Sequence, residues 1–287
     1  MPEIYENFLP LYLTMEGTAT EQEMNTNSLE TLKRGYQGIK PYLDSYDGAV
    51  SIVGAGPSLE RTYKELRGDV LACNSAIGYL LEHGVVPRWA MIWDAHPLVE
   101  KFAVPHPDVT YFVAARCHPS VFERLKDCKV VSWFAGGDHN IAQFMLKNRI
   151  ADPMVNGGSA AVTRSMFLAF ALGYREFHIF GADSSYSDEG ATHVAGSVVP
   201  EKDLTVWIGN KPGMARRFRT TPEWCAQVEE FKIMFETFHN NLQAKIYVYG
   251  DGMLQHVARI LWAQRITRKE YQKVRFTQPL EVSHAGI

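Results

Sequence analysis

A glycine-rich stretch follows the first apolar, β-branched run of the sequence. It contains Gly54, Gly56, Pro57 and Ser58, and glycines at such a point let the backbone turn tightly and approach a ligand closely. Proline suits the first turn of a helix, and a helix start presents N–H groups and a positive dipole end that favour phosphate. The spacing is neither G-x-G-x-x-G nor a Walker A loop. The stretch predicts a phosphate-binding loop, with a ligand-free strand-to-helix turn as the alternative.

A second glycine-rich helix start lies further along the chain, and the same dipole argument predicts phosphate binding there. Its residues are Asn156, Gly157, Gly158 and Ser159. The alternative is an asparagine turn followed by a serine helix cap. Between these two glycine-rich stretches, Asn74 and Ser75 end another apolar run. The asparagine amide both donates and accepts hydrogen bonds, so it suits a nucleobase or ribose, although either residue can equally cap the next helix.

Acidic side chains end two further apolar runs, at Asp94 and Asp183. A carboxylate at the end of a strand can bind Mg²⁺, contact a ribose hydroxyl or act as a base, and the alternative is a turn aspartate. Tyr186 and His193 follow in a polar stretch and are candidates for acid–base chemistry, although a lone histidine in a polar loop is more often only solvated. Asp94, Asp183, His193 and Tyr186 form the predicted catalytic set, with the two aspartates as predicted metal ligands.

A basic cluster at residues 211–219 includes Arg216 and Arg217. Guanidinium groups bind carboxylates and phosphates in a bidentate manner, so these two arginines are predicted to bind an anionic substrate. A solvated basic face is the alternative.

Short apolar runs alternate with helical patterns over most of the chain. This alternation predicts an α/β fold, a Rossmann-like and mostly parallel sheet with helices on both faces. Ligands bind outside the carboxyl ends of the strands in such sheets, which is where the candidate residues lie. Thr221 and Pro222 predict the start of a helix that reaches about Asn240. The predicted strands are 49–53, 70–73, 89–93, 109–113, 129–133, 177–180 and 246–249.

Three segments are predicted from this pattern. Residues 1–47 form an N-terminal helical extension, in which the spaced apolar positions of 24–42 indicate a helix. Residues 48–260 form the Rossmann-like domain, and 184–221 break its rhythm as a lid. Residues 261–287 form a C-terminal tail.

Composition narrows the class of protein. The chain has 287 residues, 46% of them hydrophobic, and a net charge of -3. The high apolar fraction argues against disorder, and the absence of a basic excess argues against a nucleic-acid partner. The N-terminus lacks the basic region of a signal peptide, and no apolar run approaches the roughly 20 residues of a membrane span. Four cysteines without a C-x-x-C pair indicate reduced, mostly buried thiols. A cytoplasmic protein is expected.

Four motifs, in their order along the chain, resemble the 6-hydroxymethylpterin diphosphokinase MptE-like family, whose domain also lies at the centre of the Maf flagellin glycosyltransferases. The motifs are residues 52–59 (IVGAGPSL), 72–76 (ACNSA), 84–94 (GVVPRWAMIWD) and 157–183, which ends in IFGAD. The same order is similar to the Campylobacter-type CMP-sialic-acid sialyltransferases. There the lid carries Gly-His-Ser, whereas this sequence has His193 three residues before Gly196.

The resemblances imply a nucleotide-dependent transferase. The MptE-like resemblance implies transfer of diphosphate from ATP to a pterin-like alcohol, with Mg²⁺ bridging the phosphates. The sialyltransferase resemblance implies sugar transfer from a CMP-sugar donor, and a nucleotide-binding module without turnover is a third alternative. The expected partners are a nucleotide and a small-molecule acceptor, and self-association into a homo-oligomer is compatible with the sequence.

Overall fold

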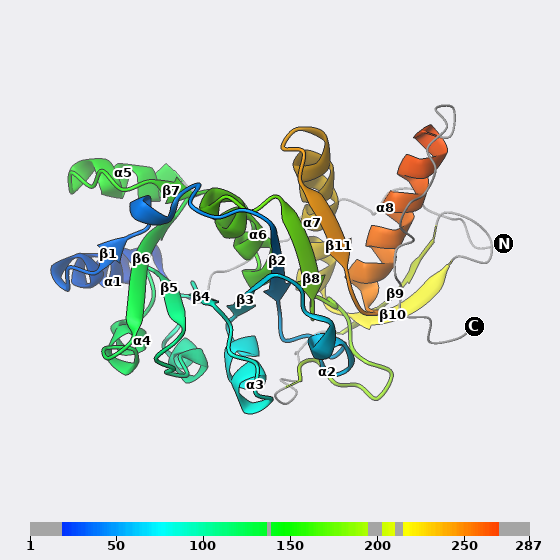
Figure 1. Ribbon diagram of the computed structural model, residues 1–287, viewed down its shortest axis with the longest axis horizontal. Coiled ribbons are helices and arrows are strands. Elements are labelled where there is room, and N and C mark those ends of the chain that lie inside the picture. Colours follow the sequence, from blue (N-terminus) through cyan, green and yellow to red (C-terminus); the bar gives the residue numbers. More distant parts are fainter. Residues whose placement is uncertain (1–18, 137–138, 195–202, 210–214, 270–287) are drawn as a thin grey trace. The chain divides into compact units, whose positions relative to one another are not determined.

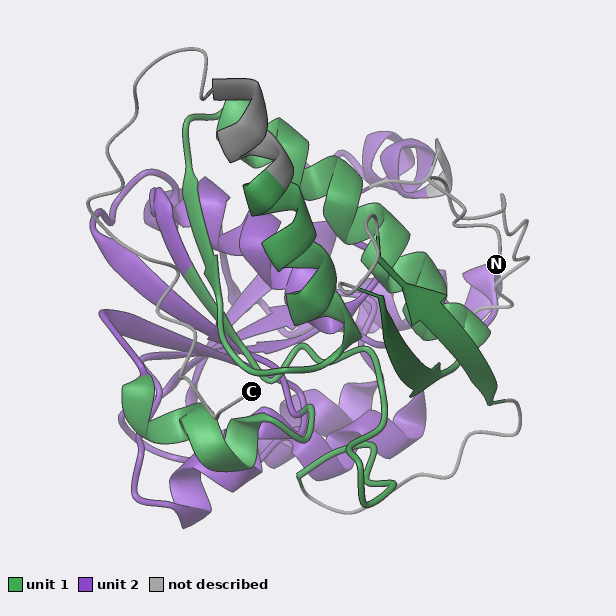
Figure 2. Ribbon diagram, turned by 90° about the vertical axis from the view of Figure 1, so that its right-hand side faces the viewer, with its two compact units in different colours: residues 1–15, 56–65, 178–287 green, residues 16–55, 66–177 purple. Residues whose placement is uncertain are grey.

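The computed structural model describes residues 19–136, 139–194, 203–209 and 215–269 (Figure 1). The chain divides into two compact units, which Figure 2 distinguishes by colour. Unit 2 contains Glu16–Ala55 and Leu66–Phe177. Unit 1 contains Gly56–Glu65 and the described part of His178–Ile287. The strands form a mostly parallel sheet with helices around it, which confirms the predicted α/β, Rossmann-like class.

The sheet of unit 2 has the strand order β1-β6-β5-β4-β3-β2, with β7 beside β6. Each of these pairs is parallel. In β4 and β5 every residue is buried, as expected for strands covered on both faces. The strands are β1 (Gln37–Gly38), β2 (Ala49–Val53), β3 (Asp69–Cys73), β4 (Trp89–Ile92), β5 (Thr110–Ala114), β6 (Lys129–Ala135) and β7 (Met154–Val155).

The helices of unit 2 lie around this sheet, and α6 packs on β2, β3 and β4. An apolar, alanine-rich sequence favours α6, which ends at Gly173 with a positive φ of 117°. A Cβ at Gly173 would lie 2.1 Å from the carbonyl oxygen of Tyr46, so only glycine fits this close approach. The helices are α1 (Glu21–Lys33), α3 (Ala76–Glu82), α4 (Pro119–Arg124), α5 (His139–Lys147) and α6 (Ala161–Leu172), with 3-10 turns at Lys40–Tyr42 and Pro97–Phe102.

In unit 1, β11 lies beside β8, and α7 packs against α8 and β11. The start of α7 agrees with the sequence, because the Thr221 side chain accepts a hydrogen bond from the Trp224 N–H at 3.2 Å and Pro222 is the first helical residue. The elements are α2 (Leu59–Thr62), a 3-10 turn (Tyr63–Glu65), β8 (Glu176–Phe180, which begins in unit 2), β9 (Leu204–Ile208), β10 (Arg216–Thr220), α7 (Pro222–Asn240), β11 (Lys245–Val248) and α8 (Met253–Lys269).

Three sequence expectations differ from the structure. The first helix runs over Glu21–Lys33 instead of 24–42, because Gly35 adopts a φ of 66° and ends it. Within 184–221, β9 and β10 pair as an antiparallel two-stranded sheet, where only a loop with a short apolar stretch was expected. Helix α8 continues to Lys269, past the expected boundary at residue 260. None of the helices in the described ranges is long and apolar enough to cross a bilayer.

The four cysteines are free thiols, and they differ in how deeply they are buried. Cys73, Cys117 and Cys225 are buried, whereas Cys128 is partly exposed. Burial raises the pKa of all four thiols, that of Cys73 to about 12. Because only Cys128 is partly exposed to a reagent, we expect a disulfide reagent such as DTNB to label this thiol first in the native chain and the other three only after unfolding. Rapid labelling that persists in a Cys128→Ser variant would contradict this expectation.

Candidate functional site

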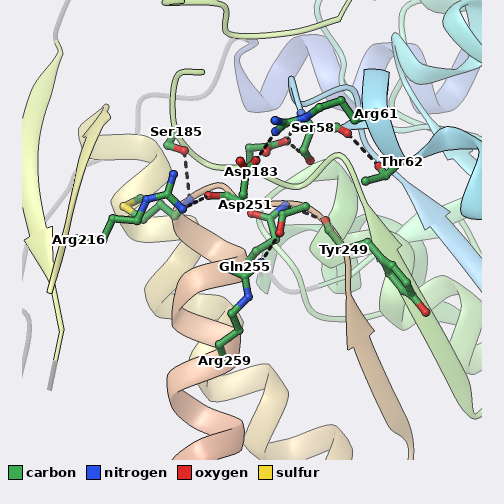
Figure 3. Close-up of polar contacts among 12 residues, drawn as sticks. Ser58, Arg61, Thr62, Asp183, Ser185, Arg216, Tyr249, Asp251, Gln255 and Arg259 are labelled. Atoms are coloured by element: carbon green, nitrogen blue, oxygen red, sulfur yellow. Dashed lines mark hydrogen bonds and ion pairs between the residues drawn. The ribbon is translucent and has the colours of Figure 1, made fainter. Parts of the chain in front are cut away.

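A cavity of about 740 Å³ lies within unit 1. Its described lining comes from α2, the segment after β8, the β9–β10 pair and the turn before α8. Figure 3 shows how several of these side chains converge around Asp183 and Asp251. Both acids and arginines line the cavity, so its surface is strongly polar. The acidic residues are Glu60, Asp183, Asp188, Glu189 and Asp251, and the basic ones are Arg61, Arg216, Arg217, Arg219 and His193.

Asp183 is the most buried acid of the cavity, with 4% of its surface exposed. Its Oδ2 accepts hydrogen bonds from the Ser58 backbone N–H at 3.2 Å and from the Ser58 hydroxyl at 3.0 Å. Burial raises the pKa of Asp183 from its ordinary 3.8 to about 6, against the lowering effect of the two Ser58 hydrogen bonds. The negative charge of Asp251 raises this pKa further, and Arg61 opposes that increase. The sequence-predicted Asp183 is therefore a carboxyl group that titrates near neutral pH.

Two N–H groups of the predicted phosphate-binding loop donate hydrogen bonds to other residues of the chain. The Gly56 N–H donates to the Gly181 carbonyl at 2.8 Å, and the Ser58 N–H to Asp183. A Cβ on Gly56 would lie 2.1 Å from the Asp183 carboxylate, so glycine is needed for this contact. Helix α2 has four residues, which leaves it only a small dipole. Phosphate binding by Gly54, Gly56, Pro57 and Ser58 stays a prediction.

Three arginines converge on the turn before α8. Arg61 pairs with the Asp251 carboxylate at 2.5 Å, and Arg216 donates to the Asp251 carbonyl at 2.8 Å. Arg259 donates to the Gly250 carbonyl at 2.5 Å, and its pKa is lowered first by burial and then by the positive charge of Arg216.

The predicted anion-binding arginines follow one another on β10. Arg217 is exposed on the cavity wall and has no ion-pair partner within the part of the chain that the structure describes. Anion binding by Arg216 and Arg217 stays a prediction, and Lys211 of the same basic cluster lies outside the described residues.

Tyr186 and His193 also line the cavity, and the Trp224 ring contacts both of them. The Trp224 ring is edge-on to the Tyr186 ring at 5.4 Å and to the His193 ring at 6.4 Å between centroids. The Arg219 guanidinium lies 4.3 Å from the centre of the Tyr186 ring. Burial raises the pKa of Tyr186, and its hydroxyl has no hydrogen-bond partner among the described residues. The hydroxyl oxygen itself is therefore shielded from solvent.

The other predicted site residues belong to unit 2 and do not line this cavity. Asp94 Oδ1 accepts a hydrogen bond from the His96 N–H at 3.0 Å. This contact is typical of a turn aspartate, which was the alternative to a catalytic or metal-binding role. Asn74 has a φ of 48°, and its side-chain oxygen is buried without a partner among the described residues. Ser75 precedes α3 without a side-chain cap.

The second glycine-rich stretch, residues 156–159, has a packing role in unit 2. Helix α6 begins at Ala161, two residues after Ser159, so Ser159 is not its cap. A Cβ on Gly157 would lie 2.4 Å from the Phe167 ring, and one on Gly158 would lie 2.3 Å from the Arg164 backbone nitrogen. Both glycines thus let the chain pass close to α6. Phosphate binding by Asn156 and the three residues after it stays a prediction.

The residues that the structure describes do not form a metal centre of the usual kind. In the described ranges no three histidine, cysteine or acidic side chains gather in a way that could hold a metal ion. Asp94 and Asp183 belong to different units. Two of the carboxylates at the cavity already have partners, since Asp183 accepts a hydrogen bond from Ser58 and Asp251 pairs with Arg61. Metal binding by Asp94 and Asp183 stays a prediction.

Sequence reasoning missed Arg61 and Asp251. The rule that selected Asp94 and Asp183, an acid just after an apolar strand, also applies to Asp251, which follows β11 by three residues. Arg61 carries no such signal, because an arginine in a short helix is usually only solvated. Its role depends on an ion pair between residues 190 positions apart in sequence.

Taken together, these observations describe a Rossmann-like α/β fold with a polar cavity that arginines and a buried carboxyl group line. The family model described as 6-hydroxymethylpterin diphosphokinase MptE-like matches residues 24–189, more than half of the sequence, and the chain belongs to this family. The predicted family resemblance is thereby confirmed.

One solved structure with a similar fold is the Maf glycosyltransferase from Magnetospirillum magneticum AMB-1. The TM-score is 0.55 at 18% identity, over 80% of this chain and 36% of that chain. This chain therefore spans little more than a third of that protein, and at this identity the likeness shows the fold alone. No curated protein matches the chain. The similarity to the sialyltransferases stays a prediction.

Proposed function

We propose that this protein is a nucleotide-dependent transferase whose reaction takes place in the cavity of unit 1. The observation that carries the proposal is the buried Asp183, with a pKa of about 6, in a cavity that Arg216 and Arg217 also line. A carboxylate with a pKa near neutral is an effective general base, and arginines bind phosphate. Membership in a family described by a diphosphokinase supports the same class of reaction.

In the proposed reaction, Asp183 accepts the proton of an acceptor hydroxyl. The hydroxyl oxygen attacks the β-phosphorus of ATP, a new O–P bond forms, and the bond from this phosphorus to the α–β bridging oxygen breaks. The electron pair leaves with AMP. Arg216 and Arg217 stabilise the negative charge on the phosphates, and Tyr186 and His193 orient the reacting groups. The proposed acceptor is a pterin-like alcohol.

Sugar transfer from a CMP-sugar is the alternative reaction in the same cavity. It also needs a base for the acceptor hydroxyl and cations for the departing phosphate, so the same residues serve both. Thermal-shift and calorimetric titrations with ATP, CMP and CMP-sugars, each with and without Mg²⁺, separate the two. Binding of CMP without binding of ATP would reject diphosphate transfer, and binding without turnover of any donor would favour a non-catalytic module. If no nucleotide raises the Tm, the proposal fails, because a ligand of the native state must stabilise it.

Arg217 provides the most direct test of the anion-binding wall. Because Arg217 is exposed and unpaired within the described residues, its loss removes charge–phosphate hydrogen bonds without disturbing a contact of the fold. Such bonds contribute about 1.5–3 kcal/mol, so Arg217→Ala should weaken nucleotide binding about 10- to 100-fold in calorimetry. Arg149→Ala, an exposed arginine of unit 2, is the matched control and should bind as the wild type does. Equal affinities in all three proteins would remove Arg217 from the site.

A further inference from the structure

Trp207 lies on the exposed face of the β9–β10 pair. Its side chain is 69% exposed, an unusual position for the largest apolar side chain. The antiparallel register places Trp207 directly opposite Arg217 and Thr205 directly opposite Arg219. Opposite residues of an antiparallel pair point to the same face, and all four are exposed. Ile208, Phe218 and Thr220 alternate with them and are buried, so the pair has one inner and one outer face.

The outer face continues the wall of the cavity. Thr205, Arg217 and Arg219 line the cavity, and Trp207 is two residues from Thr205 on the same strand. Side chains two residues apart on a strand lie on the same face. The Trp207 indole therefore stands beside the cavity, next to an arginine that has no ion-pair partner in the described part of the chain.

An indole beside a guanidinium is suited to a particular ligand chemistry. The indole offers a flat face on which a planar heterocycle stacks, and the guanidinium binds a phosphate or stacks on a ring itself. A ligand that carries an aromatic ring and phosphates would contact both groups at once. A nucleotide has this composition, whereas an aliphatic phosphate would leave the indole in water.

We infer that Trp207 is the stacking surface for the nucleobase of the donor nucleotide, and that Arg217 holds its phosphates. This inference rests on the proposed function and assigns to Trp207 a role in specificity. The nucleobase lies on the outer face of the β9–β10 pair, and the phosphates lie at the part of the cavity wall that Arg217 lines.

The test compares ligands with and without the ring. Calorimetry measures the Kd of ATP against that of inorganic triphosphate, and of CMP against that of inorganic phosphate, for the wild type and for Trp207→Ala, Trp207→Phe and Ile233→Ala. Ile233 is also 69% exposed, on α7, so its variant controls for removal of an exposed apolar side chain. Stacking on an aromatic side chain corresponds to a change in Kd of about 5- to 100-fold. Trp207→Ala should weaken nucleotide binding by this factor and leave the ring-free anions unchanged. Trp207→Phe should retain most of the affinity, and Ile233→Ala all of it.

Other outcomes distinguish the alternatives. If the wild type binds no nucleotide, the proposed function itself fails. If the wild type binds nucleotides and Trp207→Ala binds them equally well, only the stacking role is overturned. An equal loss of affinity for nucleotides and for ring-free anions would also overturn the stacking role. The substitution would then have changed the anion-binding wall of the cavity and not a contact with the ring. A fall in the solution mass of Trp207→Ala with unchanged nucleotide affinity would show that a second copy of the chain covers the indole instead.

Discussion

Asp183→Asn is expected to stabilise the folded protein at pH 8 by on the order of 3 kcal/mol. The reason is the buried carboxylate, whose pKa rises from 3.8 to about 6 on folding, mainly through burial. A shift of one pKa unit corresponds to about 1.4 kcal/mol. Asparagine has nearly the same shape, keeps an oxygen that accepts the two Ser58 hydrogen bonds and carries no charge. If Asp183 is the proposed base, the same variant should lose transferase activity.

The gain should depend on pH in a defined direction. Because the pKa of Asp183 is higher in the folded state, the native protein binds more protons than the unfolded chain between about pH 4 and 6. The stability that Asp183 contributes is present in full below pH 3.8 and is lost as the pH rises through about 6. The difference between the variant and the wild type should therefore be near zero at pH 3.5 and reach its full value above pH 7. Urea denaturation across this range measures it.

Asp188→Asn is the matched control for this experiment. Asp188 lines the same cavity but is exposed, so the substitution should change the free energy of unfolding by no more than about 0.5 kcal/mol at any pH. A pH-independent difference for Asp183→Asn, or equal curves for both variants, would show that the Asp183 carboxylate is solvated.

Gly250→Ala should destabilise the protein by about 2–5 kcal/mol. Gly250 has a φ of 109°, and a Cβ there would lie 2.3 Å from the Ser58 hydroxyl oxygen and 3.0 Å from the Gln255 amide nitrogen. Two costs combine, a positive φ at about 1–2 kcal/mol and overpacking at about 1–3 kcal/mol. Since Ser58 holds Asp183, the substitution should also disturb the cavity.

Gly190→Ala separates these two costs. Gly190 also has a positive φ, of 87°, but the nearest atom to its Cβ would lie 3.8 Å away. The Gly190→Ala variant should therefore lose only about 1–2 kcal/mol of stability, which is the cost of a positive φ for alanine. Urea midpoints at constant m-value give both numbers. If the two alanine variants are equally stable, the segment around Gly250 can shift to accommodate a Cβ. The close approach of Gly250 to Ser58 would then not be required for stability.

The fold could be predicted where short-range patterns decide the structure. The apolar run 49–53 is β2 to the residue, and Thr221 with Pro222 marked the start of α7. Strand β10 was missed because its sequence, RRFRT, contains three arginines and a single apolar residue, Phe218. Pairing with β9 fixes this segment as a strand, and such pairing is a tertiary effect that no local pattern reports.

The candidate site was predicted only in part, for a similar reason. A position at the end of a strand identified Asp183, and charge identified Arg216 and Arg217. The partners that set the properties of Asp183 come from elsewhere, since Ser58 precedes it by 125 residues. A pKa depends on burial and on such contacts, so the sequence indicated a carboxylate without indicating its proton affinity. The predicted catalytic set combined Asp94 of unit 2 with residues of unit 1. A position at the end of a strand does not indicate to which unit a residue belongs.

The distance along the chain between Ser58 and Asp183 also sets an order of events during synthesis. At about 5–20 residues per second, the ribosome takes roughly 6–25 s to add the 125 residues that follow Ser58 up to and including Asp183. Throughout this interval the Ser58 hydroxyl and N–H lack the carboxylate that accepts from them in the folded protein. The short helix α2 therefore acquires its carboxylate only after the strands of unit 2 have been synthesised, and the cavity cannot be complete before then.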